Sequence, residues 1–223
     1  LPSFSASRFC LVDRGITFAI AHIRGGGDLG DIWHEEGKKK LKKNTFLDYI
    51  ACANHLIDQR YTFKGGVCFY GGSAGGLTGG ALANMAPELF FSMLLLVPFV
   101  DTMTTMLNEK LPLTPSEWEL WGNPIKNKEY FEYILSYSPY NNLDNKNYPS
   151  MLITTSIFDN RVLYSEPVKY IAKLRDVRND NNTQLLKCKM KAAGHGGMSG
   201  RDNAIIELSE EYSFILKTGK ILN

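Results

Sequence analysis

The chain has 223 residues, of which 25 are basic and 23 acidic, so its formal net charge is +2. This balance argues against a dedicated nucleic-acid binder, and a composition of 44% hydrophobic and 22% charged residues excludes a disordered chain. No run of 18 apolar residues is present, so neither a transmembrane helix nor a membrane partner is expected. The cysteines have no paired spacing, which is typical of reduced thiols and predicts a cytoplasmic protein; they are Cys10, Cys52, Cys68 and Cys188.

Strand-like and helix-like segments alternate along the chain. Apolar and β-branched runs predict strands at residues 15–24, 66–70, 92–100, 150–156 and 184–190. Apolar residues at helical spacing predict helices over residues 45–60, 74–85, 165–175 and 203–216. Thr45 and Asp48 resemble a capping box, and Ser165 can cap the helix that follows it. Together these elements predict an α/β fold, with a mostly parallel sheet that helices cover on both faces.

Two segments fall outside this alternation. Residues 38–43 form a basic run, which is expected to be a solvated loop or helix end. Residues 101–149 form a long excursion with several prolines and two tryptophans. The excursion leaves a strand at its carboxyl end, which is the edge where α/β sheets place their functional sites.

The strongest chemical signal is a G-x-S-x-G motif centred on Ser73. Gly71 and Gly75 flank the serine between a predicted strand and a predicted helix, which is the setting of a nucleophile elbow. Residues 71–80 contain six glycines, although each glycine in a helix costs about 1 kcal/mol relative to alanine. This helix is therefore expected to pack unusually close to its neighbours.

A serine nucleophile needs a base and an acid that orients the base. In hydrolases with this elbow the chain order is serine, acid, histidine, and only His195 of the four histidines follows Ser73. It lies in a glycine-rich loop after the last predicted strand. Two residues fit the acid, because Asp159 and Asp101 each follow a predicted strand between the serine and the histidine.

A competing motif lies earlier in the chain. Residues 25–30 match G-x-G-x-x-G after a predicted strand, as in dinucleotide-binding folds. The next predicted strand, however, does not end in an acidic residue that could bind a ribose. Neither a metal-ligand spacing of histidines nor a phosphate-binding loop is present, so no metal or cofactor is expected.

Taken together, several motifs resemble the catalytic domain of prolyl-oligopeptidase-family serine peptidases, an α/β-hydrolase fold. The motifs occur in the family's order; they are Ala21-His22-Ile23-Arg24-Gly25-Gly26-Gly27, Gly71-Gly72-Ser73-Ala74-Gly75-Gly76, Tyr137-Ser138-Pro139-Tyr140, Asp159-Asn160-Arg161-Val162 and Gly194-His195-Gly196-Gly197. The segments Glu117-Trp118-Glu119 and Trp121-Gly122-Asn123-Pro124 resemble the oligopeptidase B branch. The resemblance covers nearly the whole chain, residues 1–223, as one peptidase catalytic domain.

The resemblance implies a catalytic triad. Ser73 would be the nucleophile, His195 the general base and Asp159 the orienting acid. It favours Asp159 over Asp101, because the family's acid stands two residues before an arginine. The backbone amide of Ala74 would be one oxyanion donor.

The resemblance also implies substrate contacts. Arg161 would hold a substrate carbonyl, and Phe99 and Val100 would line the pocket for the residue before the cleaved bond. By themselves, Glu117 and Glu119 are compatible with solvated surface charges. In the resembling branch they bind arginine or lysine, which implies cleavage of short basic peptides after these residues.

The resemblance implies parts that this sequence does not contain. Family members carry a β-propeller domain, and a tyrosine that precedes the matching region supplies a second oxyanion donor. The chain is therefore expected to be a piece of a larger enzyme. The alternative is a catalytically silent hydrolase-fold fragment or paralogue that acts as a binding module; a small esterase would need an oxyanion motif that is not found before Ser73.

Overall fold

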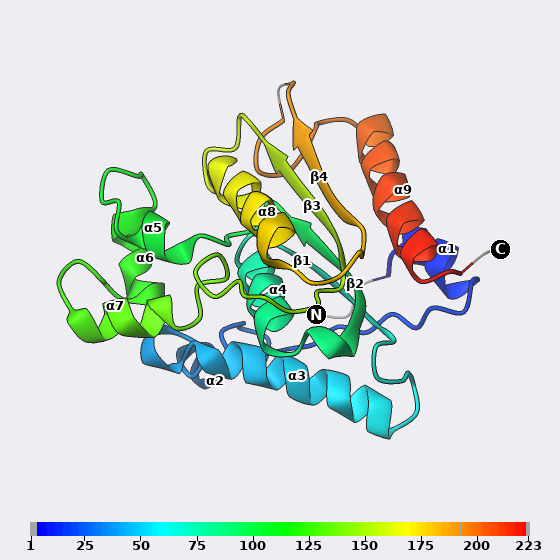
Figure 1. Cartoon of the computed structure of the whole chain (residues 1–223), viewed down its shortest axis with the longest axis horizontal. Helices are drawn as coiled ribbons and strands as arrows, with labels where there is room; N and C mark the ends of the chain where they lie inside the picture. The colour runs from blue at the N-terminus through cyan, green and yellow to red at the C-terminus, as the bar shows by residue number, and fades with distance from the viewer. Residues whose placement is uncertain (1–3, 192, 222–223) are drawn as a thin grey trace.

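The computed structural model describes residues 4–191 and 193–221, and its centre is a sheet of four parallel strands (Figure 1). The strands lie in the order β1-β2-β3-β4. Their bounds are Val67–Gly72 for β1, Phe90–Leu96 for β2, Ser150–Ser156 for β3 and Gln184–Lys189 for β4. The predicted α/β class is confirmed, and four of the five predicted strands are present within a few residues of their predicted bounds.

The prediction of a strand at residues 15–24 is wrong. The only ladder contact of this segment in the described chain is an isolated bridge between Arg24 and Gly26. Phe18 and Ile20 remain 43% and 48% exposed. β-Branched and aromatic residues favour a strand only where a neighbouring strand accepts the backbone hydrogen bonds, and β1 pairs with β2 alone among the described residues.

Helices connect the strands. The four long ones match predicted helices; they are α3 (Lys43–Asp58), α4 (Ala74–Met85), α8 (Ser165–Val177) and α9 (Arg201–Thr218). Three helices lie in the excursion after β2, namely α5 (Thr102–Met106), α6 (Thr114–Trp121) and α7 (Lys128–Leu135). The remaining helical segments are short: η1 (Ala6–Arg8), α1 (Phe9–Val12), α2 (Asp31–Glu35), η2 (Lys39–Leu41) and η3 (Pro87–Leu89). No described helix is long and apolar enough to cross a membrane.

The two faces of the sheet bury separate apolar clusters. Met93 and Leu95 of β2 belong to the larger cluster, which packs beneath α3, α4 and α8. Leu94, which points the other way, joins Tyr212 and Ile215 of α9 in the smaller cluster. Successive strand residues face opposite sides, so this division follows directly from the apolar run of β2.

Helix α4 packs as closely as its glycines predict. A Cβ added to Gly76 would lie 2.4 Å from Pro98 Cβ, and one added to Gly79 would lie 2.4 Å from Leu95. Gly75 differs, because a Cβ there would meet no atom within 4 Å outside its immediate neighbours. The close approach therefore depends on Gly76 and Gly79 and not on Gly75.

The two capping predictions are wrong. Helix α3 begins at Lys43, which places Thr45 inside it, and Thr45 Oγ1 instead donates to the carbonyl of Arg24 at 2.7 Å. Asp48 accepts from Arg24 N at 2.9 Å and Nε at 2.8 Å. Thr45 and Asp48 thus hold the residue before Gly25 against α3. Ser165 is the first residue of α8, whose cap position is Tyr164.

The basic run is only partly solvated. Lys39 pairs with Glu119 at 2.9 Å, and Lys40 pairs with Glu129. Lys42 is buried, with Nζ 5.1 Å from the centre of the Trp121 ring, and burial lowers its pKa to about 8. The expectation of a uniformly solvated run is therefore wrong at Lys42.

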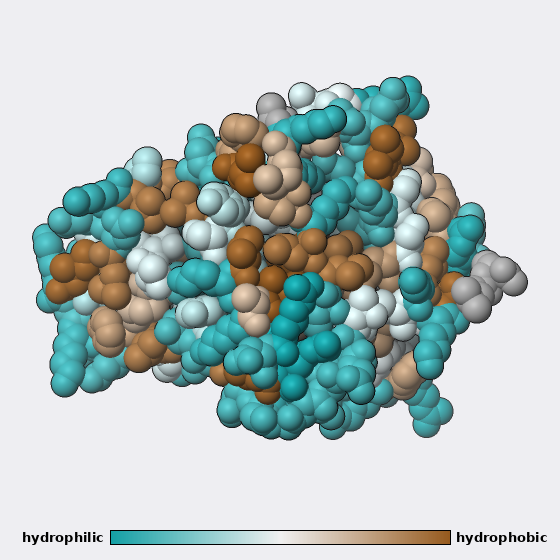
Figure 2. All heavy atoms as spheres, turned by 45° about the horizontal axis from the view of Figure 1, so that its top comes forward, coloured by the Kyte–Doolittle hydropathy of each residue, from teal (hydrophilic) through white to brown (hydrophobic). Residues whose placement is uncertain are grey.

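Large apolar side chains also remain at the surface. Phe158, Leu163 and Tyr164 follow β3 and are 55%, 38% and 46% exposed. Figure 2 shows hydrophobic side chains gathered across the middle of the face that it displays, with hydrophilic side chains around them. Parts of the surface are thus apolar in the described chain.

Candidate active site

Ser73 lies in a strained turn between β1 and α4. Its φ of 55° and ψ of −121° fall where residues with a Cβ are rarely found. Two backbone hydrogen bonds hold the turn: Ser73 N donates to Leu96 O at 2.9 Å, and Phe99 N donates to Ser73 O at 3.1 Å. This is the geometry of a nucleophile elbow, in which the serine side chain projects from the carboxyl edge of the sheet.

Ala74 is the first residue of α4. The first N–H groups of a helix have no acceptor within that helix, and the helix dipole adds partial positive charge there. The Ala74 amide therefore suits an oxygen that gains negative charge beside Ser73.

His195 is paired with Asp159. The distance from His195 Nδ1 to Asp159 Oδ2 is 2.8 Å, and the Asp159 side chain is fully buried. Asp159 Oδ1 accepts from Arg161 N at 2.9 Å and from Val162 N at 3.0 Å. The carboxylate is thus fixed by two amides while its other oxygen holds the imidazole.

The rival acid, Asp101, has a different partner. Its Oδ2 accepts a hydrogen bond from Lys169 Nζ of α8, and its backbone N donates to Glu166. Of the two acids that the sequence left open, the structure brings only Asp159 to the histidine.

The loop that carries His195 is held at both ends. Gly197 N donates to Gly194 O at 3.0 Å and closes a turn around the histidine. Ser156 Oγ donates to Ala193 O before the turn. After it, Glu207 of α9 accepts from Met198 N at 3.3 Å and pairs with Lys189 at 2.6 Å.

The three predicted triad residues follow different strands of the same sheet. Ser73 follows β1, Asp159 follows β3 and His195 follows β4, and parallel strands end at one edge. No hydrogen bond joins Ser73 Oγ to the His195 ring in the described part of the chain. The Ser73–His195 contact therefore stays a prediction.

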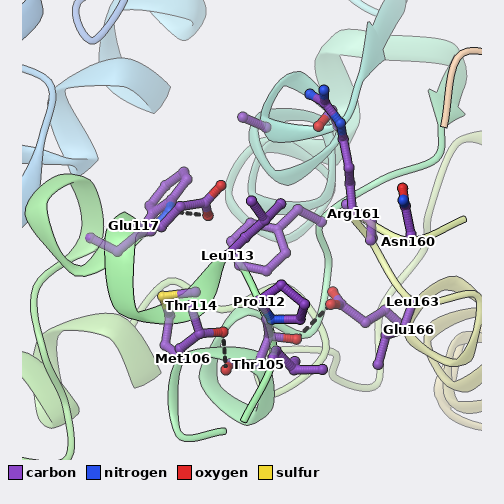
Figure 3. Close-up of a pocket in the computed structure, with 16 residues that line it drawn as sticks. Thr105, Met106, Pro112, Leu113, Thr114, Glu117, Asn160, Arg161, Leu163 and Glu166 are labelled. Carbon is purple, nitrogen blue, oxygen red and sulfur yellow. Dashed lines mark hydrogen bonds between the residues drawn. The ribbon is translucent and has the colours of Figure 1, made fainter. Parts of the chain in front are cut away.

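A cavity of about 120 Å³ opens beside Ser73 and Ala74 (Figure 3). One wall is the excursion from Thr105 to Trp121, and the other is the segment from Asn160 to Glu166. Among the predicted substrate contacts, Phe99, Glu117 and Arg161 line it. The cavity is therefore placed to receive a side chain next to the nucleophile.

Two predicted pocket residues lie elsewhere. Glu119 is 84% exposed and pairs with Lys39, which holds the pKa of that carboxyl below its usual range. Residues two apart on a helix point about 200° apart, so α6 cannot present Glu117 and Glu119 to one cavity. Val100 is buried beneath α4, where a Cβ on Gly80 would lie 3.2 Å from Val100 Cγ1.

Glu117 itself is fixed by its neighbour on α6. Its Oε2 accepts from Trp121 Nε1 at 3.0 Å, as Figure 3 shows. Trp121 is buried and also lines the cavity. This bond leaves Glu117 Oε1 available to a ligand.

Sequence reasoning missed Glu166. This residue of the first turn of α8 lines the cavity, is only 4% exposed, and burial raises its pKa to about 7. An acidic residue in a first helical turn ordinarily complements the helix dipole at the surface. One signal in the sequence could have identified it: Glu166 lies in the first turn of the helix that follows β3, and the carboxyl ends of the strands form the edge that carries the site.

The glycine-rich alternative near the start of the chain lacks its expected setting. No described strand precedes residues 25–30, and the helix that follows, α2, has five residues. Nor does any group of three or more His, Cys, Asp or Glu side chains in residues 4–191 and 193–221 have a metal-binding arrangement.

Comparison with known proteins agrees with this geometry. A model described as "Prolyl oligopeptidase family" matches residues 2–221. The chain is 53% identical over 215 residues to "Protease 2" of Moraxella lacunata, covering 96% of this chain and 31% of that protein. It is 47% identical over 215 residues to "Dipeptidyl aminopeptidase BI" of Pseudoxanthomonas mexicana, covering 96% of this chain and 30% of that protein.

A solved structure shares the fold. Oligopeptidase B from Leishmania major superposes with a TM-score of 0.95 at 44% identity, over 99% of this chain and 30% of that one. The α/β-hydrolase fold is thereby confirmed. The chain spans about 30% of the length of these relatives. On the match over residues 2–221, the chain belongs to the prolyl oligopeptidase family of serine peptidases.

Proposed function

We propose that the chain is the catalytic domain of a serine peptidase that cleaves short peptides after arginine or lysine. The observation that carries the proposal is the 2.8 Å pair of His195 with the buried carboxylate of Asp159, at the sheet edge where Ser73 occupies a strained elbow. A nucleophile, a base and an orienting acid are the groups that acyl transfer requires.

In the proposed reaction, Ser73 Oγ attacks the carbonyl carbon of the scissile bond. With Nδ1–H donating to Asp159, the lone pair of His195 lies on Nε2, which takes the serine proton. The Ala74 amide stabilises the oxyanion of the tetrahedral intermediate. Collapse breaks the peptide C–N bond as His195 returns the proton to the leaving amine, and water then hydrolyses the acyl-enzyme by the same route.

The specificity part of the proposal rests on Glu117. Its carboxylate lines the cavity beside the nucleophile, where a cationic side chain would find an acceptor away from bulk water. Phe99 supplies apolar surface for the aliphatic part of that side chain, and Arg161 is near enough to the cavity to hold a substrate carbonyl. Glu119 does not contribute to this proposed specificity, because its carboxylate is paired with Lys39.

The proposal extends to the whole protein. The relatives are about three times as long as this chain, which supports a further domain outside it. A β-propeller that admits only short peptides is proposed for that part. A cytoplasmic location is also proposed, supported by the four cysteines, none of which is in a disulfide.

The test is hydrolysis of a peptide panel that differs only in the residue before the cleaved bond. Cleavage after arginine and lysine is expected, with hardly any after leucine, phenylalanine or proline, and none with Ser73→Ala. Cleavage after other residues would contradict the specificity. Peptide binding without hydrolysis would instead favour a silent binding module.

A further inference from the structure

Glu166 approaches the cavity from the side opposite Glu117. Glu117 comes from α6 and Glu166 from α8, and both line the cavity next to Ser73 (Figure 3). Glu166 is only 4% exposed, whereas Glu119, the second carboxylate expected from the sequence, is 84% exposed and lies outside the cavity. The cavity therefore has two acidic walls made by a different pair of glutamates.

Hydrogen bonds fix the Glu166 carboxyl in place. Oε2 accepts from Asp101 N at 2.9 Å, and Oε1 accepts from Thr105 Oγ1 at 2.6 Å. A carboxylate has about four acceptor positions, so each oxygen can take a further donor. The protein thus positions Glu166 without using up its acceptor capacity.

Among the described residues, no salt bridge gives Glu166 a cation of its own. Asp101 adds negative charge nearby. Lys169 attracts the Glu166 charge more weakly, and its ammonium donates to Asp101. Arg161 also lines the cavity, but its guanidinium points away from the Glu166 carboxyl in Figure 3. A buried carboxylate without a paired cation is unfavourable, and a ligand cation would relieve it.

We infer that Glu166 is a second specificity-determining residue, which binds the cationic side chain of the substrate together with Glu117. The inference rests on the proposed function for the substrate class. A guanidinium carries five donors in a planar fork and can bind carboxylates on two walls at once. Glu166 thereby takes the role that the family resemblance implied for Glu119.

Equilibrium binding tests the inference without any need for catalysis. Benzamidinium mimics a guanidinium, and benzamide is its neutral counterpart; calorimetry gives the ratio of their affinities. We expect the unaltered chain to bind benzamidinium more tightly than benzamide. Glu166→Gln should lower this ratio of affinities about tenfold or more, because hydrogen bonds between charged groups are stronger than those between neutral groups. The glutamine fits, because its oxygen can accept from Asp101 N and its amide can donate to the Thr105 hydroxyl.

Two matched variants separate charge from structure. Glu119→Gln removes an equal charge outside the cavity and should leave the preference unchanged. Thr105→Val removes one hydrogen bond to Glu166 but leaves the Glu166 charge in place. The affinities for benzamidinium and benzamide should therefore fall by similar factors. A preference unchanged in Glu166→Gln would overturn the inference. Equal binding of the two ligands by the unaltered chain would overturn both the inference and the proposed Arg/Lys specificity.

A crystal structure of the unaltered chain with benzamidinium gives a readout that needs no variant. An amidinium nitrogen within hydrogen-bond distance of a Glu166 oxygen is expected. An amidinium that contacts Glu117 alone would contradict the role of Glu166. Failure of the nucleophile chemistry would appear separately, as loss of hydrolysis with cation binding intact.

Discussion

His195 Nδ1 lies 2.8 Å from Asp159 Oδ2, while two backbone amides bind the other oxygen of the same carboxylate. The amides come from Arg161 and Val162, two and three residues after the aspartate. One short turn therefore orients the carboxylate, and the carboxylate orients the imidazole. The ring is held with Nδ1 as the donor, which leaves Nε2 free to accept a proton.

This relationship predicts the effect of Asp159→Asn. The asparagine oxygen can keep both amide bonds, but its NH₂ then faces Nδ1 and favours the tautomer with the proton on Nε2. Reaction of Ser73 with a neutral fluorophosphonate should slow by about 10³ to 10⁴. Mass spectrometry of samples quenched at successive times gives the rate constant of this reaction. A decrease of less than about tenfold would show that the Asp159 carboxylate does not set the tautomer of His195.

Glu117→Gln and Glu119→Gln should behave differently. Glu117 lines the cavity and Glu119 pairs with Lys39. A peptidyl phosphonate ending in arginine should label Glu117→Gln more slowly by about tenfold or more, because a charge-assisted bond is lost. Glu119→Gln should label at the rate of the unaltered chain.

A phenylalanine-ended phosphonate is the control for that pair of variants. Its labelling should be similar in both, since it carries no cation. If both substitutions slowed labelling by the arginine-ended phosphonate equally, the arginine side chain would not bind at Glu117.

The glycines of α4 make a prediction about stability. A Cβ on Gly76 would lie 2.4 Å from Pro98 Cβ and 2.5 Å from its Cα. Gly76→Ala should therefore lower the free energy of unfolding by about 1–3 kcal/mol or more. Gly75→Ala is the matched control, because it adds the same methyl group in open space and should be neutral or stabilising by up to about 1 kcal/mol. Urea denaturation measures both, and equal effects would mean that α4 does not depend on the close approach.

Lys42 predicts a pH dependence. Burial lowers its pKa from 10.5 to about 8, so the unfolded chain binds more protons than the folded one between these values. The contribution of Lys42 to the free energy of unfolding should rise as the pH increases from about 8 toward 10.5.

Lys42→Met removes this contribution, because it replaces the ammonium that lies 5.1 Å from the centre of the Trp121 ring with an uncharged thioether. The variant should gain most over the unaltered chain near pH 7, and its advantage should shrink toward pH 10. Parallel stability curves from urea titrations at several pH values would show that the Lys42 ammonium is not penalised by burial.

Local chemistry explains why the elbow could be predicted. Ser73 needs a glycine-rich strand-to-helix turn, and the residues of that turn are neighbours in the sequence. The acid was different, because Asp159 and Asp101 both follow a predicted strand, and only the family resemblance favoured Asp159. The alternating apolar pattern predicted four strands and four long helices within a few residues of the bounds that the structure shows.

Features that depend on distant partners could not be predicted in the same way. Residues 15–24 have strand composition, but no strand of the described chain pairs with them. Glu119 looks equivalent to Glu117 until the helix rotates it toward Lys39, 80 positions earlier in the chain. Glu166 becomes a pocket residue only because α8 packs next to the excursion after β2.

The most direct test of the whole account is reaction of the chain with a fluorophosphonate, followed by intact-mass and peptide mass spectrometry. The account predicts a single adduct, on Ser73, that is abolished by Ser73→Ala and formed far more slowly by His195→Ala. An unreacted chain, or an adduct on another residue with Ser73 unmodified, would contradict the assignment of Ser73 as the nucleophile.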